Sequence, residues 1–158
     1  MEKFTFFWRT RSPFSNWHIS PFEIDGIWYN CSEQWMMAEK ARLFDDKKIL
    51  IKILASTEPR DQKALGRLVQ GFDKAKWDAI AREIVYKGCV AKFSQNPKLK
   101  EALLATEGTT MVEASPVDCI WGIGLAEDDP RALDRSKWLG TNWLGEVLDR
   151  VREEFLKV

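Results

Sequence analysis

The chain has 158 residues, in which 24 Lys and Arg balance 24 Asp and Glu, and its pI is near 6.6. This balance argues against a nucleic-acid coat protein or a membrane-surface binder, because both need a sustained basic excess. With 45% hydrophobic and 30% charged residues, the composition is that of a folded globular protein and excludes a disordered one.

The first part of the chain predicts a β-hairpin followed by a helix. Residues 4–8 and 22–29 are rich in β-forming side chains, and Asp25-Gly26 divides the second run with a two-residue turn signal. Asn30 is expected to be the N-cap of the next helix, because Glu33 follows it three residues later as in a capping box.

The rest of the chain predicts mostly helices. Helical signals follow in order at residues 45–55, near 57–71, from Asp73 with an apolar stripe as far as Ala91, at 98–106 after Asn96-Pro97, and from Asn142 to the end of the chain. A strand is expected at 109–114. The long stretch 115–142, rich in Gly, Pro and Asp, is predicted to be a functional loop. We therefore expect a mainly α protein with a small antiparallel β-sheet, organised as one compact domain over residues 1–158.

The cysteine pattern bears on compartment and on metal binding. Cys31, Cys89 and Cys119 are odd in number and widely spaced, and His18 is the one histidine of the chain. This pattern favours free buried thiols in a reducing cytoplasm and predicts no metal site. The apolar runs are too short for a membrane span, so the protein is expected to be cytoplasmic, with no membrane partner.

One candidate site combines a carboxylate with an amine. Glu33 and Lys40 are seven residues apart in a predicted helix, so two turns bring them to about the same face. They are suited to act as an acid/base pair or as a nucleophile with its partner. The alternative is that Glu33 completes a capping box and Lys40 is a solvated surface residue.

A second candidate site lies in the segment SPVDCIWGIG. Asp118 and Trp121, with Gly122 in the same turn, can present an acid beside a flat ring. That pair suits a nitrogen heterocycle attached to a sugar, since Trp stacks on the base while the carboxylate faces the sugar. The alternative is an Asp that caps a turn and a Trp that seals the core.

A set of polar side chains could bind a phosphate through charge-assisted, fork-shaped contacts. Its members are Arg9, Arg11, Ser15, Asn16 and Arg67. Each Arg taken alone is more typical of a surface ion pair. The ring of Trp77 lies on the apolar stripe of the helix predicted from Asp73, which by periodicity alone places it in the core.

Six segments carry a recognisable pattern in order: SPFSNW at 12–17, FEIDGIWYNCSEQWMMAEKA at 22–41, KALGR at 63–67, AKFSQNPKLKEALLAT at 91–106, VEASPVDCIWGIGL at 112–125 and NWLGEVLDRVRE at 142–153. With these segments the chain resembles, over essentially its full length, the YbiA-like proteins of the NADAR (NAD and ADP-ribose) superfamily. The resemblance implies a mainly helical fold with a small sheet. It also implies an N-glycosidase acting on ribosylated amino-pyrimidines, the early phosphorylated intermediates of riboflavin synthesis.

The resemblance implies functional roles for Glu33, Lys40, Trp77, Asp118 and Trp121. Gln34-Trp35 departs from the His and Tyr typical of the bacterial riboflavin-pathway type, and residues 124–140 form a longer loop. That loop is expected to border the pocket and to affect the choice of substrate.

The expected reaction is hydrolysis of the bond between ribose phosphate and an exocyclic amino group, with a small phosphorylated N-ribosyl compound as substrate and no cofactor. Glu33 or Asp118 would serve the sugar and the water, and Lys40 could instead form a Schiff base with the opened sugar. Nucleic acid is expected only as an ADP-ribosylated substrate. The alternatives are an ADP-ribosyl-guanine glycohydrolase and a non-catalytic ADP-ribose or nucleotide-binding module.

Overall fold

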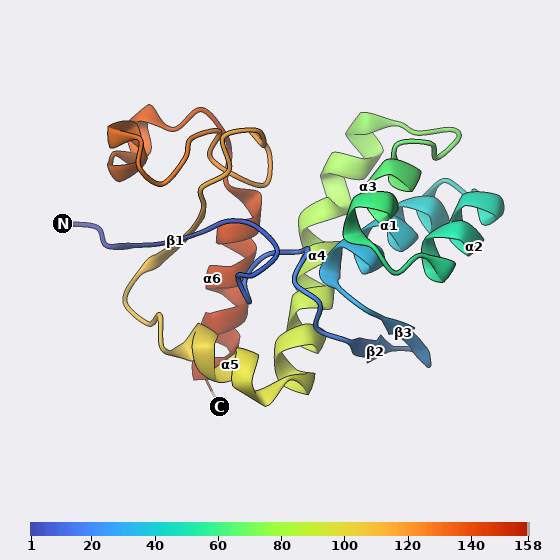
Figure 1. Cartoon of the computed structure of the whole chain (residues 1–158), viewed down its shortest axis with the longest axis horizontal. Helices are drawn as coiled ribbons and strands as arrows, with labels where there is room; N and C mark the ends of the chain where they lie inside the picture. The colour runs from blue at the N-terminus through green and yellow to red at the C-terminus, as the bar shows by residue number, and fades with distance from the viewer. Residues whose placement is uncertain (158) are drawn as a thin grey trace. The chain divides into compact units, whose positions relative to one another are not determined.

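The computed structural model describes residues 1–157, which divide into two compact units (Figure 1). We call residues 16–96 the helical unit, and residues 1–15 together with the chain from Pro97 onward the terminal unit. That they combine as one domain over 1–158 stays a prediction. Helices dominate the described chain, which confirms the predicted mainly α class.

Helix α1 (Ser32–Leu43) is the centre of the helical unit. It contacts α2 (Lys47–Ala55), α3 (Pro59–Gly66) and the long α4 (Lys74–Gln95), as Figure 1 shows. Glycines allow two of these contacts to be close. A Cβ atom on Gly88 would lie 2.3 Å from Trp35 Cδ1, and one on Gly66 would lie 2.0 Å from Met37 Sδ.

The predicted start of α1 at an Asn30 cap is wrong. Its N-cap is Cys31, which makes no side-chain capping bond, and the helix begins at Ser32. The Asn30 amide instead donates to Thr57 O at 2.7 Å and accepts from Gln62 Nε2 at 3.0 Å. Asn30 therefore joins the segment before α3 to the start of α1, and Glu33 is left for another partner.

The hairpin of the helical unit has the predicted turn. Strands β2 (Phe22–Ile24) and β3 (Ile27–Tyr29) pair antiparallel, and Asp25 and Gly26 between them have φ of 52° and 81°. Positive φ at both turn residues is what a two-residue hairpin turn requires. Gln95 at the end of α4 exchanges two hydrogen bonds with the backbone of Glu23, and these attach the hairpin to the helix.

The terminal unit contains a second strand pair, and its direction differs from the prediction. Strands β1 (Phe4–Phe7) and β4 (Thr110–Glu113) run parallel, with Phe4 opposite Thr110. A hairpin turn forces neighbouring strands to be antiparallel, whereas strands joined through a long connection are free to be parallel. The prediction of an antiparallel sheet therefore holds for the hairpin alone.

Helix α6 (Trp143–Leu156) packs on β4, and α5 (Pro97–Leu104) packs on α6. Asn142 precedes α6 as the predicted N-cap residue, with a left-handed backbone. Its side chain does not cap the helix. It donates to Met111 O and accepts from Glu113 N, both at 3.0 Å, so it fixes the start of α6 to the strand.

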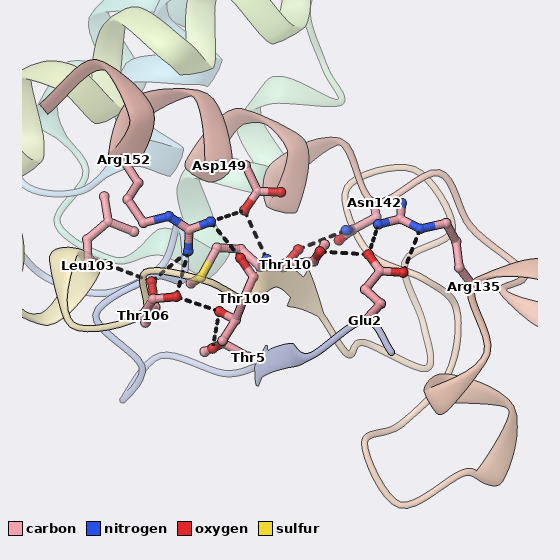
Figure 2. Close-up of polar contacts among 11 residues, drawn as sticks. Glu2, Thr5, Leu103, Thr106, Thr109, Thr110, Arg135, Asn142, Asp149 and Arg152 are labelled. Atoms are coloured by element: carbon pink, nitrogen blue, oxygen red, sulfur yellow. Dashed lines mark hydrogen bonds and ion pairs between the residues drawn. The ribbon is translucent and has the colours of Figure 1, made fainter. Parts of the chain in front are cut away.

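The stretch predicted as a functional loop contains two short 3₁₀ helices, η1 (Pro130–Leu133) and η2 (Arg135–Lys137). The Trp138 ring packs against a cluster of Val112, Ile123, Leu125 and Ala132. Glu2 forms an ion pair with Arg135 and accepts from Thr110 Oγ1 (Figure 2). The loop is thus held to the N-terminal segment and to β4.

The buried guanidinium of Arg152 fixes the turn before β4. It donates to the backbone oxygens of Thr106 and Thr109 and to Asp149 Oδ1, and this carboxylate in turn accepts from Met111 N (Figure 2). Charged side chains of this unit are therefore used to hold its backbone.

Candidate active site

Glu33 is the best-defined member of the candidate site. It lies in the first turn of α1 and is only 4% exposed. Its backbone N–H donates to Asn16 O at 2.9 Å, and its Oε1 accepts from Trp17 Nε1 at 2.8 Å. The helix N-terminus favours a negative charge at this position. The structure thus places a fixed carboxylate where the sequence expects an acid, a base or a nucleophile.

Lys40 lies two turns further along α1 and is half-buried, with its Nζ 4.5 Å from the centre of the Phe72 ring. Burial lowers the pKa of Lys40, the charge of Glu33 opposes this shift, and the charge of Arg67 adds to it. A lowered pKa increases the fraction of neutral amine, which is the nucleophilic form. Lys40 therefore interacts electrostatically with both Glu33 and Arg67.

Helix α3 places two cations near α1. Gly66 lets the helices approach because its missing side chain leaves room for Met37. Lys63 Nζ lies 5.9 Å from the centre of the Trp17 ring, and Arg67, the C-cap residue of α3, is exposed. Lys63 thus lies against the ring that bonds the Glu33 carboxylate, and the charge of Arg67 acts on Lys40.

Trp77 occupies the first turn of α4, after the N-cap Asp73, whose side chain accepts from Lys76 N. Its side chain is 8% exposed, as the apolar stripe of the helix indicates. A stacking role for Trp77 stays a prediction.

Asp118 lies in the terminal unit, and its side chain stabilises the turn that it begins. One carboxylate oxygen, Oδ1, accepts from the backbone N–H groups of Ile120 and Trp121, each at 2.9 Å. The Trp121 ring is partly exposed and meets Trp143 edge-on, with 5.5 Å between the ring centres. The turn alternative for Asp118 is therefore realised, while a contact of either residue with substrate stays a prediction.

Gly122 is where two backbone segments approach each other. A Cβ atom here would lie 2.9 Å from Glu113 O and 3.0 Å from Asp118 O. The position therefore needs a glycine for packing, and a role in binding substrate stays a prediction.

The predicted phosphate-binding residues are divided between the units. Arg9, exposed and with φ of 73°, places its guanidinium 4.6 Å from the centre of the Trp8 ring, and Ser15 is buried. Both belong to the terminal unit with exposed Arg11, whereas buried Asn16 belongs to the helical unit with Arg67. The helical unit brings Asn16, Glu33, Lys40 and Arg67 together.

The predicted thiol state is correct for two cysteines and wrong for the third. All three are free, but Cys119 is exposed. Burial raises the pKa of Cys31 to about 12 and that of Cys89 to about 11. Within residues 1–157, no group of three or more His, Cys, Asp and Glu is placed to hold a metal ion. In the same part of the chain, no helix is long and apolar enough to cross a membrane.

Sequence reasoning missed three residues that surround Glu33 and Lys40. Trp17 bonds the Glu33 carboxylate, Lys63 lies over Trp17, and Phe72 lies under Lys40. The four-residue spacing of Lys63 and Arg67 on a helix was a signal for their common face. No local pattern indicates the contact of Trp17 with Glu33, because it joins a loop to a helix.

Comparison with known proteins identifies the family. The NADAR domain matches residues 6–156. Protein irg-1 of Caenorhabditis elegans is 41% identical over 96% of this chain and 79% of its own length. N-glycosidase R617 of Acanthamoeba polyphaga mimivirus is 46% identical over 80% of this chain and 74% of its own.

Two further relatives add the fold and a pathway name. The riboflavin biosynthesis protein PYRR of Arabidopsis thaliana, a chloroplast protein, is 36% identical over 66% of this chain and 16% of its own. The NMR structure of the Escherichia coli protein YbiA matches 99% of this chain and 88% of its own, with a TM-score of 0.80 and 27% identity. The chain therefore belongs to the NADAR domain family and is a YbiA-like N-glycosidase.

Proposed function

We propose that this enzyme hydrolyses the bond between ribose phosphate and an exocyclic amino group of a heterocycle. Its substrates would be early intermediates of riboflavin synthesis, the phosphoribosylamino-pyrimidines. The observation that carries the reaction is Glu33, a buried carboxylate held at the start of α1, whose charge interacts with the amine of Lys40. The name of the relative PYRR supports the substrate class.

Hydrolysis breaks the bond between the anomeric carbon of the sugar and nitrogen. The nitrogen gains a proton from water and leaves as a free amine, while the hydroxyl of the water joins the anomeric carbon. The carbon becomes positively charged in the transition state, so a fixed carboxylate stabilises it and can orient or deprotonate the water. We assign this role to Glu33, because Asp118 Oδ1 already accepts two backbone N–H groups.

Lys40 offers a second route from the same geometry. A sugar bound through an exocyclic nitrogen can open to an imine, and a neutral amine can then displace the leaving amine as a Schiff base that water later hydrolyses. The lowered pKa of Lys40 suits this step. The basic side chains of Arg67 and Lys63 would hold the phosphate, and Trp77 of the same unit would stack on the base.

A panel of substrates tests the proposal. Phosphoribosylamino-pyrimidines, ADP-ribosyl-guanine in DNA, NAD and free ADP-ribose are each assayed for released base and reducing sugar, with Glu33→Gln as the inactive control. Release from the amino-pyrimidines is expected to be the fastest. Release from ADP-ribosyl-guanine alone would favour the second glycosidase function, and release of nicotinamide from NAD alone would overturn the proposal.

Borohydride separates the two routes. Added during turnover, it should reduce an imine to a stable sugar adduct on Lys40, which mass spectrometry would locate. Absence of the adduct, together with an active Lys40→Ala variant, would eliminate the imine route and leave direct hydrolysis by water.

A further inference from the structure

Three tryptophans donate through their indole N–H to acceptors of different kinds. Trp35 Nε1 donates to Ile84 O at 2.8 Å, and Trp138 Nε1 donates to Ala132 O at 2.9 Å. Both acceptors are backbone carbonyls, as expected for rings that fix a fold. Trp17 Nε1 donates to the Oε1 of Glu33 at 2.8 Å, so its acceptor is a carboxylate in the candidate active site.

Two successive residues hold Glu33 at both ends. The carbonyl of Asn16 accepts the backbone N–H of Glu33, and the indole of Trp17 binds its carboxylate. The backbone bond fixes where the side chain starts, and the indole bond fixes where it ends. A hydrogen bond to an ionised acceptor is stronger than one between neutral groups, so this contact restricts the carboxylate more than a carbonyl contact would.

The Trp17 ring is itself held by charge. The ammonium of Lys63 lies 5.9 Å from the centre of the ring, within the range of a cation–π contact. A cation near the face of the ring draws electron density from the indole, which makes its N–H a better donor. A chain of contacts therefore runs from Lys63 on α3 through the Trp17 ring to the carboxylate of Glu33 on α1.

We propose that Trp17 is a positioning residue for Glu33: its indole N–H holds the carboxylate in the orientation that the glycosidase reaction needs. The inference rests on the proposed function of Glu33 and adds a residue to it. The orientation of a catalytic group is worth a large factor in rate, on the order of 100-fold for a displacement of about 1 Å.

The test is Trp17→Phe, which keeps a ring beside Lys63 and removes the donor. We expect kcat to fall on the order of 10- to 100-fold, while KM changes little, because the substrate contacts are kept. In a Glu33→Gln background, the same substitution should cause no further loss, since the group that it orients is gone.

The matched control is Trp35→Phe, which removes an indole donor bonded to a carbonyl in the same unit. It should lower Tm and leave kcat close to wild type. A Trp17→Phe enzyme with wild-type kcat, or an equal kcat loss in Trp35→Phe, would overturn the inference. An active Glu33→Gln would instead refute the assignment of Glu33 in the proposed function, whatever Trp17→Phe does.

A second measurement avoids any change at Trp17 and does not depend on whether Trp17→Phe folds. In Glu33→Gln the acceptor loses its charge, so the indole proton resonance of Trp17 should move upfield, while those of Trp35 and Trp138 stay in place. An unchanged Trp17 resonance would show that the hydrogen bond to Glu33 is absent in solution and would overturn the inference.

Discussion

Glu33 of the helical unit uses its carboxylate differently from Asp118 and Asp149 of the terminal unit. In the helical unit, Glu33 is buried and its Oε1 is held by the side chain of Trp17. In the terminal unit, Asp118 accepts two backbone N–H groups of its own turn, and Asp149 accepts the backbone N–H of Met111. A carboxylate committed to the backbone shapes the chain, whereas one oriented by another side chain is suited to chemistry.

The basic side chains follow the same division. Arg152 and Arg135 in the terminal unit bind backbone oxygens or the carboxylate of Glu2 (Figure 2). In the helical unit, Lys40 is half-buried, and its charge interacts with those of Glu33 and Arg67. The comparison teaches that Arg152 and Arg135 anchor the backbone and the N-terminal segment, whereas the charge of Lys40 interacts with the buried acid Glu33.

The largest expected effect distinguishes the two carboxylates. Glu33→Gln should reduce kcat by about 10²- to 10⁴-fold, the usual contribution of an acid or base group. Asp118→Asn should cost much less, because the amide oxygen of Asn can accept the same two backbone N–H groups. Sugar release from a phosphoribosylamino-pyrimidine measures both.

Asp118→Ala completes this test, since it removes the acceptor. It should lower the free energy of unfolding by about 1 kcal/mol through loss of the turn bonds. If Asp118→Asn were as inactive as Glu33→Gln while its stability stayed normal, the charge of Asp118 would be catalytic and the contrast between the carboxylates would fail.

Substitution of one glycine in each unit should change stability by different amounts, because the neighbouring atoms differ. A Cβ on Gly145 would lie 2.0 Å from the backbone oxygen of Met111, whereas one on Gly66 would lie 2.0 Å from the side-chain sulfur of Met37. A methionine side chain can move and a strand carbonyl cannot, so Gly145→Ala should destabilise the protein by about 1–3 kcal/mol and Gly66→Ala by less. Urea unfolding compares the two, and equal losses would contradict the prediction.

The last expected effect depends on pH and concerns Lys92 of the helical unit, which is fully buried. Burial lowers the pKa of Lys92 from 10.5 to about 8. Between these values the unfolded chain holds a proton that the folded protein releases, so this group makes the free energy of unfolding rise with pH in that window. The buried thiols of Cys31 and Cys89 act in the opposite direction, because burial raises the pKa of each above its usual 9.0.

Lys92→Met isolates the amine, since the thiols remain in both proteins. The variant should gain stability relative to wild type as pH falls, with the difference changing by about 1 kcal/mol between pH 9 and pH 8. Lys76→Met removes an exposed lysine of the same helix as a control. A Lys92→Met difference that does not depend on pH would show that the amine is hydrated in the folded protein.

The sequence by itself determined the elements whose signals are local. The turn at Asp25-Gly26, the start of the long helix near Asp73 and the common side of Glu33 and Lys40 follow from turn chemistry and the helical period. The family resemblance, carried by several motifs in order, was confirmed by the match to the NADAR domain.

Tertiary structure decided the contacts between distant segments. Asn30 does not cap α1 as predicted, because its side-chain amide forms hydrogen bonds with Thr57 and Gln62 instead. The indole of Trp17 bonds the Glu33 carboxylate although 16 residues separate them in the sequence. The pairing of β1 with β4 is parallel because no turn constrains it. Local sequence patterns predict on which face of a helix a side chain lies. A hydrogen bond between distant segments depends on how the helices pack, and the periodicity of the sequence does not contain that information.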